Sequence, residues 1–106
     1  MTWQKDRDAG FENQFAHREE VAFKVAAHRN RMLAQWAAQR MGLRDQATSD
    51  YVASVVTSDV AHLRGRGIIQ KIVADLAAAK APVNETEVAA AFDRFHAQSI
   101  AEHKND

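Results

Sequence analysis

The feature that most limits the possible folds is the long run from Phe11 to Met41, which contains neither glycine nor proline. Both residue types are rare elsewhere, and after this run they occur only at Gly42, Gly65, Gly67 and Pro82. Glycine and proline mark turns and helix ends, so these positions divide the chain into four segments. Each segment has helical apolar spacing, and no Asn-Gly hairpin signal occurs. The sequence therefore predicts an all-α chain.

The segment from Val21 to Met41 has the broadest apolar face, which is typical of the central helix of a bundle. Its apolar residues include Val21, Ala22, Val25, Met32, Leu33 and Trp36, with a second strip of Phe23, Ala27, Ala34, Ala38 and Met41. Arg29 falls within this face. Because an unpaired buried charge is costly, the sequence predicts a carboxylate partner for Arg29, with Asp59 as a candidate. Gly42 and Leu43 predict a left-handed helix stop.

The three later segments each predict one shorter helix. The second, from Ala47 to Leu63, either ends near Ser58 or includes Asp59 on its apolar face. The fourth begins at Asn84, with Glu87 three residues later, which is a variant of the capping box. The expected inner face of the second segment comprises Tyr51, Val52, Val55, Val56 and Leu63. That of the third comprises Ile68, Ile69, Ile72, Val73 and Leu76, and that of the fourth comprises Val88, Phe92, Phe95 and Ile100. At 106 residues, we expect the chain to form one compact four-helix bundle.

Composition excludes several classes of protein. The chain has no cysteine, so disulfides and cysteine zinc sites are impossible. Its apolar runs are far shorter than the roughly 20 residues needed to cross a bilayer, and its first residues resemble no secretory signal. We therefore expect a cytoplasmic protein with no direct membrane insertion.

Catalytic patterns are also lacking. None of the five histidines belongs to a compact metal-ligand motif, and there is no nucleophile elbow or phosphate loop. Asp93 and His96 lie one turn apart and are candidates for a shared metal or ligand, although the pattern favours a surface ion pair on a helix. We expect neither an enzyme nor a cofactor.

The charge is zero overall but unevenly distributed. Residues 21–44 contain no acidic residue, whereas their bases are Lys24, Arg29, Arg31, Arg40 and Arg44. Neighbouring acidic segments favour internal neutralisation of these bases over nucleic-acid binding. A helical bundle that binds nucleic acid or an anionic surface remains the alternative function.

The N-terminal segment carries aromatic residues among charges. Phe11 and Phe15 lie at i and i+4, so they share one helix face. Two interpretations fit: the rings cap the bundle core, or they are anchors that dock into a partner. The helix is expected to begin between Asp6 and Phe11. Gly10 lies in this onset and costs about 1 kcal/mol relative to alanine, so we expect partial disorder before it.

These residues resemble the ATPase inhibitor zeta subunit family of alphaproteobacteria. The resemblance is carried by Asp6, Arg7, Phe11, Glu12, Asn13, Phe15, Ala16, His17, Glu19, Glu20, Phe23 and Lys24, then by Arg29, Asn30, Leu33, Trp36, Ala37 and Ala38, and it extends more loosely over nearly the whole chain. The Phe-Glu-Asn-x-Phe-Ala-His block is the most specific part.

The resemblance implies an inhibitory subunit of F-type ATP synthase, with an arm of residues 1–17 and a four-helix body of residues 18–106. The arm would enter an alpha/beta interface of the catalytic sector, near the gamma subunit, and block ATP hydrolysis. It implies a monomer located in the cytoplasm, peripheral to the inner membrane through ATP synthase. The implied partner-binding residues are Asp6, Arg7, Phe11, Glu12, Asn13, Phe15 and His17.

Two residues depart from the family pattern. Gly10 lies beside Ala9 where better helix formers are expected, and Arg18 replaces an acid. Because Gly10 raises the cost of ordering the arm, a subunit that binds without inhibiting is a further alternative.

Overall fold

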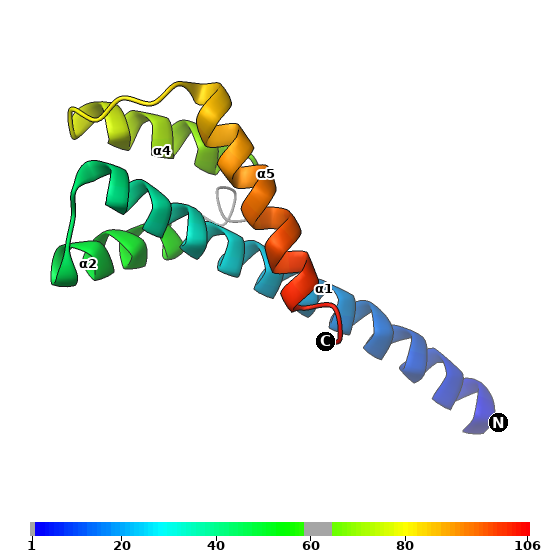
Figure 1. The fold of residues 1–106 in the computed structure, drawn as a ribbon. Coiled ribbons are helices and arrows are strands. Elements are labelled where there is room, and N and C mark those ends of the chain that lie inside the picture. The colour runs from blue at the N-terminus through cyan, green and yellow to red at the C-terminus, as the bar shows by residue number, and fades with distance from the viewer. Residues whose placement is uncertain (1, 59–64) are drawn as a thin grey trace.

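The computed structural model describes residues 2–58 and 65–106, and within them the side chains of residues 15–58 and 65–106. These residues form four helices and no strand: α1 (Thr2–Met41), α2 (Asp45–Val56), α4 (Gly67–Ala78) and α5 (Glu85–Glu102). Helix α1 packs against each of the other three, and α4 also packs against α5 (Figure 1). The predicted all-α four-helix bundle, with a long central helix, is confirmed.

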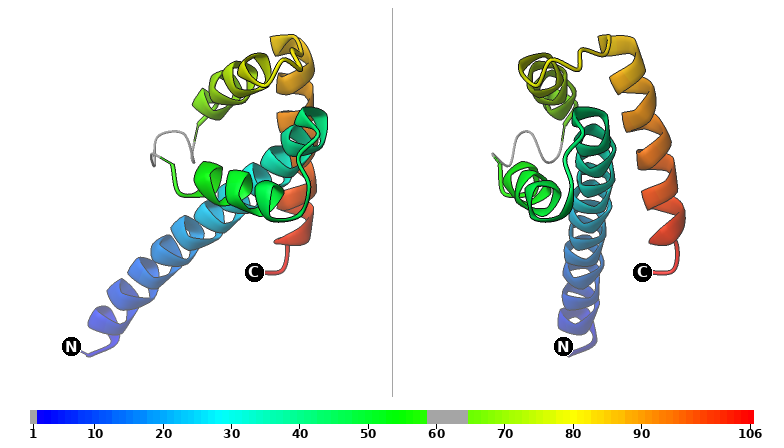
Figure 2. Two further views of the ribbon diagram at one scale, coloured as in Figure 1. Left: turned by 90° about the vertical axis from the view of Figure 1, so that its left-hand side faces the viewer. Right: turned by 60° about the vertical axis from the view of Figure 1, so that its left-hand side comes forward.

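Helix α1 extends well beyond the bundle at its N-terminal end. All views show this end projecting away from α2 and α4 (Figure 2). The helix begins at Thr2, so the predicted start between Asp6 and Phe11 is wrong. The physical reason is that one glycine weakens a helix by about 1 kcal/mol without breaking its hydrogen-bond ladder. Disorder before Gly10 in the free protein stays a prediction.

The core lies where α1 crosses the later helices. It comprises Leu33, Ala34 and Ala37 of α1, Val55 of α2, Ile68, Ile69, Ile72 and Leu76 of α4, and Val88, Ala91 and Phe92 of α5. The predicted stripe of α4 and the predicted burial of Val25, Leu33 and Phe92 are therefore confirmed.

Three apolar residues that we expected inside are exposed. Ile100 is 51% exposed and Phe23 is 45% exposed, and Ala22 is also exposed. All three lie where α1 and α5 extend past α2 and α4. Fewer neighbouring helices are therefore available to cover the apolar side chains of α1 and α5 there. Near the end of α5, the residue that packs against α1 is Ser99, which is fully buried.

The helix ends are well defined by local hydrogen bonds. At the end of α1, Gly42 has φ +79°, and the amide of Leu43 donates to the carbonyl of Ala38 at 3.0 Å, which confirms the predicted stop. Asn84 Oδ1 accepts from the amide of Glu87 at 2.8 Å, which confirms the predicted cap of α5. Helix α2 ends at Val56, so the earlier of its two predicted ends is correct.

Helix α4 ends in the same motif as α1, but without glycine. Lys80 occupies the left-handed position with φ +61°. The amide of Lys80 donates to Ala77 O at 3.1 Å, and the amide of Ala81 donates to Leu76 O at 2.9 Å. These two bonds are those of a Schellman motif.

Candidate partner-binding surface

The first described side chains of α1 lie on the surface. Residues 15–20 are all exposed, and Phe15 is 61% exposed. The interpretation that both rings cap the bundle core is therefore wrong for Phe15. The other predicted arm contacts, Asp6, Arg7, Phe11, Glu12 and Asn13, lie outside the residues whose side chains the structure describes.

His17 joins the base of the arm to the other end of the chain. Its Nε2–H donates to the backbone carbonyl of Asp106 at 2.5 Å. Of the predicted arm contacts, Phe15 faces solvent, whereas His17 is exposed but hydrogen-bonded within the chain. The C-terminal residue therefore lies beside the start of the bundle.

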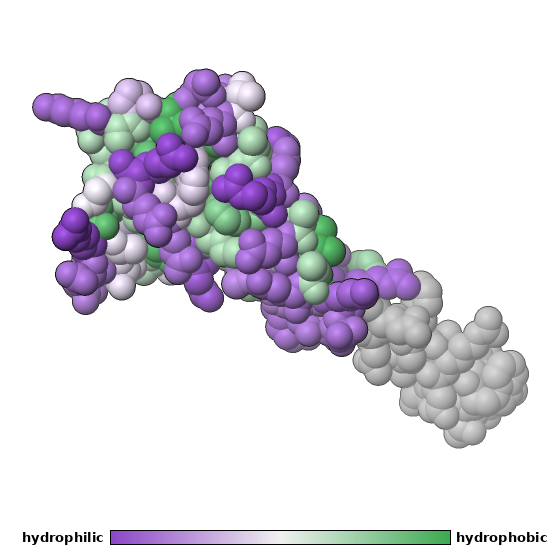
Figure 3. Space-filling view, viewed as in Figure 1, coloured by the Kyte–Doolittle hydropathy of each residue, from purple (hydrophilic) through white to green (hydrophobic). Residues whose placement is uncertain are grey.

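An open groove of about 600 Å³ lies between α1 and the end of α5. Its apolar wall comprises Val21, Ala22, Val25, Ala26 and Ile100, and its polar lining comprises Arg18, Glu19, Arg29, His96, His103 and Lys104. Hydrophobic surface is visible near this crossing, among mostly hydrophilic side chains (Figure 3). Sequence reasoning missed this groove because it depends on the angle at which α5 crosses α1.

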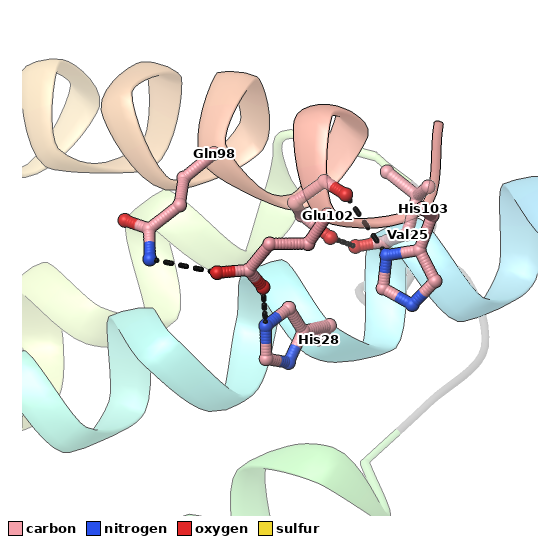
Figure 4. Close-up of polar contacts among 6 residues, drawn as sticks. Val25, His28, Gln98, Glu102 and His103 are labelled. Carbon is pink, nitrogen blue, oxygen red and sulfur yellow. Dashed lines mark hydrogen bonds and ion pairs between the residues drawn. The ribbon is translucent and has the colours of Figure 1, made fainter. Parts of the chain in front are cut away.

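Polar contacts join the end of α5 to α1 (Figure 4). Ser99 Oγ donates to Val25 O at 2.8 Å, and His103 Nδ1–H donates to Ser99 O at 2.8 Å. His28 Nε2 is paired with the carboxylate of Glu102, and the His28 and His103 rings meet edge to face with centroids 5.6 Å apart.

The carboxylate of Glu102 receives hydrogen bonds from two sides. Gln98 Nε2 donates to it at 3.1 Å, and His28 occupies its other oxygen. These donors, Gln98 first and then His28, hold the pKa of Glu102 below its usual value. Glu102 therefore connects the end of α5 to His28 of α1.

Arg29 is buried at the side of the groove, with 3% of its surface exposed. Its Nε donates to Asn30 Oδ1 at 3.0 Å, its Nη1 donates to His96 Nδ1 at 3.4 Å, and its guanidinium lies 4.3 Å from the centre of the Phe92 ring. Desolvation, followed by repulsion from Arg66, lowers the pKa of Arg29 to about 10. The guanidinium therefore keeps its charge at neutral pH. Its predicted partner, Asp59, lies outside the described residues.

Residues 1–102 match the model of the protein family described as "ATPase inhibitor subunit zeta". The chain belongs to this family. The match covers the arm and nearly all of the bundle, which confirms the resemblance inferred from the Phe11–His17 block and supports an inhibitory role at an ATP synthase. No curated protein and no solved structure matches the chain.

Two bases of the predicted basic segment, residues 21–44, are paired with carboxylates. Lys24 pairs with Glu20 at 3.4 Å, and Arg40 pairs with Glu87 at 3.3 Å. Arg40 also lies 4.9 Å from the centre of the Trp36 ring. For these two bases the pairs agree with the internal neutralisation expected from the charge pattern.

Asp93 and His96 face different partners. Asp93 Oδ1 accepts from Arg66 Nη1 at 2.9 Å, whereas His96 accepts from Arg29 and stacks on Phe92 with centroids 6.2 Å apart. Among the described residues, no cluster of three or more potential metal ligands is present. The same part of the chain holds no helix long and apolar enough to cross a membrane.

Proposed function

We propose that this member of the ATPase inhibitor subunit zeta family blocks ATP hydrolysis by inserting its arm, residues 1–17, at an alpha/beta interface of F-type ATP synthase. The observation that carries the proposal is the exposure of Phe15. A ring that is 61% exposed on a projecting helix contributes nothing to the core, and it offers an aromatic anchor to a partner.

The continuity of α1 supports a wedge mechanism. The arm and the central helix of the bundle form one helix, Thr2–Met41. Within the bundle this helix is held by the fully buried residues Leu33, Ala34, Ala37 and Ala38. A helix fixed at one end transmits force along its axis, while the four-helix body is too wide to follow a single helix into an interface. Rotation of the gamma subunit would then be opposed by the whole bundle.

The residues of the arm divide into anchors and polar contacts. Burial of one phenylalanine side chain stabilises a complex by about 1.5–3 kcal/mol, which is tenfold or more in affinity. Phe11 and Phe15 serve as these anchors in the proposal. Asp6, Arg7, Glu12, Asn13 and His17 supply the charges and hydrogen bonds that set the register of the arm.

This function implies a location for the protein and a set of partners. A monomer would bind the alpha and beta subunits, close to gamma, in the cytoplasm. It would be peripheral to the inner membrane through ATP synthase alone. Neither nucleic acid nor a bound cofactor takes part.

Deletion of residues 1–17 tests this function. ATP hydrolysis by the purified catalytic sector is measured with the full chain and with the deleted chain, and circular dichroism follows the unfolding of both. We expect loss of inhibition, a nearly unchanged unfolding temperature and less helix by about the length of the arm. A deleted chain that still inhibits, or a body that melts without the arm, contradicts the proposal.

A further inference from the structure

The groove between α1 and α5 is a second surface that the arm mechanism does not use. The described residues that line it belong to α1, to α5 and to the two positions after α5. Its floor contains Val25 and Ala26, which are nearly buried, and Ile100 forms an exposed wall. An apolar groove of about 600 Å³ beside two exposed helix surfaces is large enough to hold several side chains of a docked helix.

The charges around the groove are mostly positive. Arg18 and Lys104 are exposed at its edge, and Arg29 lies buried at its side. Among the described lining residues, Glu19 is the one acid, and His96 and His103 are the histidines. This arrangement is complementary to an apolar helix that carries acidic residues at its border.

The groove also lies in line with the anchor of the arm. Ala22 follows Phe15 by seven residues, which is two helical turns, so both lie on the same face of α1. A partner surface that contacts Phe15 and continues along this face of α1 therefore reaches the groove. Phe15 and the groove therefore lie on the same side of α1, with Arg18 and Glu19 between them.

We propose that this groove binds an amphipathic helix of the catalytic sector of ATP synthase, and that this contact holds the body beside the enzyme while the arm is inserted. The inference rests on the proposed function. Apolar residues spaced three or four apart on the partner helix fill the space between Val21, Val25 and Ile100. An acidic residue of the same helix pairs with Arg18 or Lys104.

The test uses full-length variants and the purified catalytic sector. Ile100→Glu places a charge on the exposed wall, and Lys104→Glu reverses a charge at the edge. Ala90→Glu is the matched control, because Ala90 is exposed on α5 and does not line the groove. Binding is measured by titration at low and high salt, and the fold of each variant is checked by circular dichroism.

We expect Ile100→Glu to weaken binding about tenfold and Lys104→Glu to weaken it several-fold at low salt only. Ala90→Glu should bind like the wild type. At saturating concentrations every variant should still inhibit fully, since the arm is intact. A photo-crosslinker at position 100 of the otherwise unchanged chain should label a helix of the catalytic sector with acidic residues beside its apolar stripe.

Other results overturn the proposal in distinguishable ways. If Ile100→Glu and Lys104→Glu bind like the wild type, or the crosslinker labels nothing in the catalytic sector, the groove is not an interface although the arm can still inhibit. If wild-type protein neither binds nor inhibits the catalytic sector, the proposed function fails as well. If the free protein self-associates and only Ile100→Glu abolishes this association, the occupant is a second copy of this chain.

Discussion

The hydroxyl of Ser99 in α5 donates a hydrogen bond of 2.8 Å to the backbone carbonyl of Val25 in α1. Both residues are buried, and Ala26 beside Val25 is small. The contact therefore fixes the position of α5 along α1 at the point where the groove begins. It links the stability of the bundle to the geometry of the candidate docking surface.

Substitution of Ser99 tests this contact. Ser99→Ala removes one buried hydrogen bond and should lower the free energy of unfolding by about 1 kcal/mol. Ser99→Leu should cost more, about 1–3 kcal/mol beyond the lost bond, because no space exists for the larger side chain. Urea denaturation measures both, with Ser54→Ala as a control on an exposed serine. Equal stability of Ser99→Leu and wild type would mean that the helices do not pack closely here.

A glycine in place of Lys80, at the end of α4, should increase the free energy of unfolding. Lys80 has φ +61°, a conformation that costs a non-glycine residue about 1 kcal/mol. Lys80→Gly should therefore stabilise the protein by up to about 1 kcal/mol in urea denaturation.

Gly42 provides the matched comparison for Lys80. It has φ +79°, and a Cβ added there would meet no atom within 4 Å, so Gly42→Ala should destabilise through backbone strain alone. We expect a loss of about 1 kcal/mol. Opposite signs for Lys80→Gly and Gly42→Ala confirm that both positions require a left-handed conformation.

Tyr51 should make the bundle sensitive to alkali. Burial, and then the hydrogen bond of 2.8 Å that its hydroxyl donates to Asp75, raises the pKa of Tyr51 well above its usual value. The unfolded chain loses this proton near pH 10, whereas the folded chain keeps it. Stability from this group is therefore complete below about pH 10 and falls as the pH rises further, by up to about 1.4 kcal/mol per pH unit.

The variant Tyr51→Phe isolates this effect. It should be less stable at neutral pH by about 1 kcal/mol and should lose less stability than the wild type above about pH 10. Because the chain has one tyrosine, its phenolate absorbance reports this group alone. A normal titration of Tyr51 in the folded protein would contradict the assigned burial and hydrogen bond.

Local patterns predicted the parts of the fold that depend on neighbours along the chain. The stripe of Ile68, Ile72 and Leu76 and the cap at Asn84 follow from helical periodicity and side-chain chemistry, and the structure confirms them. Ile100 has the same periodicity but is exposed, because burial at the end of a helix depends on which other helices reach that far.

Contacts between distant residues were harder to predict for the same reason. Arg29 contacts Asn30, His96 and Phe92, a set that includes two residues of α5 and that no spacing in α1 indicates. The groove likewise arises from the crossing of α1 and α5. For the candidate site, the residues indicated the family, whereas the exposure of Phe15 was one of two open interpretations and the apolar groove was not predicted.

Gly10 should limit the strength of inhibition. If the residues before it become ordered on binding, Gly10→Ala makes this ordering easier by about 1 kcal/mol and should strengthen inhibition about fivefold. Ala9→Gly, the adjacent reverse change, should weaken it by a similar factor. Unchanged inhibition constants in both variants would show that the arm does not fold on binding.

The central claim is that the exposed aromatic residue of the arm inhibits the enzyme. Phe15 and Phe23 form a matched pair, since both are exposed on α1 and only Phe15 belongs to the arm. The decisive measurement is the inhibition constant for ATP hydrolysis by the purified catalytic sector with Phe15→Ala and with Phe23→Ala. If Phe15 is an anchor of the arm, Phe15→Ala weakens inhibition at least about tenfold, whereas Phe23→Ala changes it less than about threefold. Equal effects of the two substitutions, or a larger effect at Phe23, would contradict it.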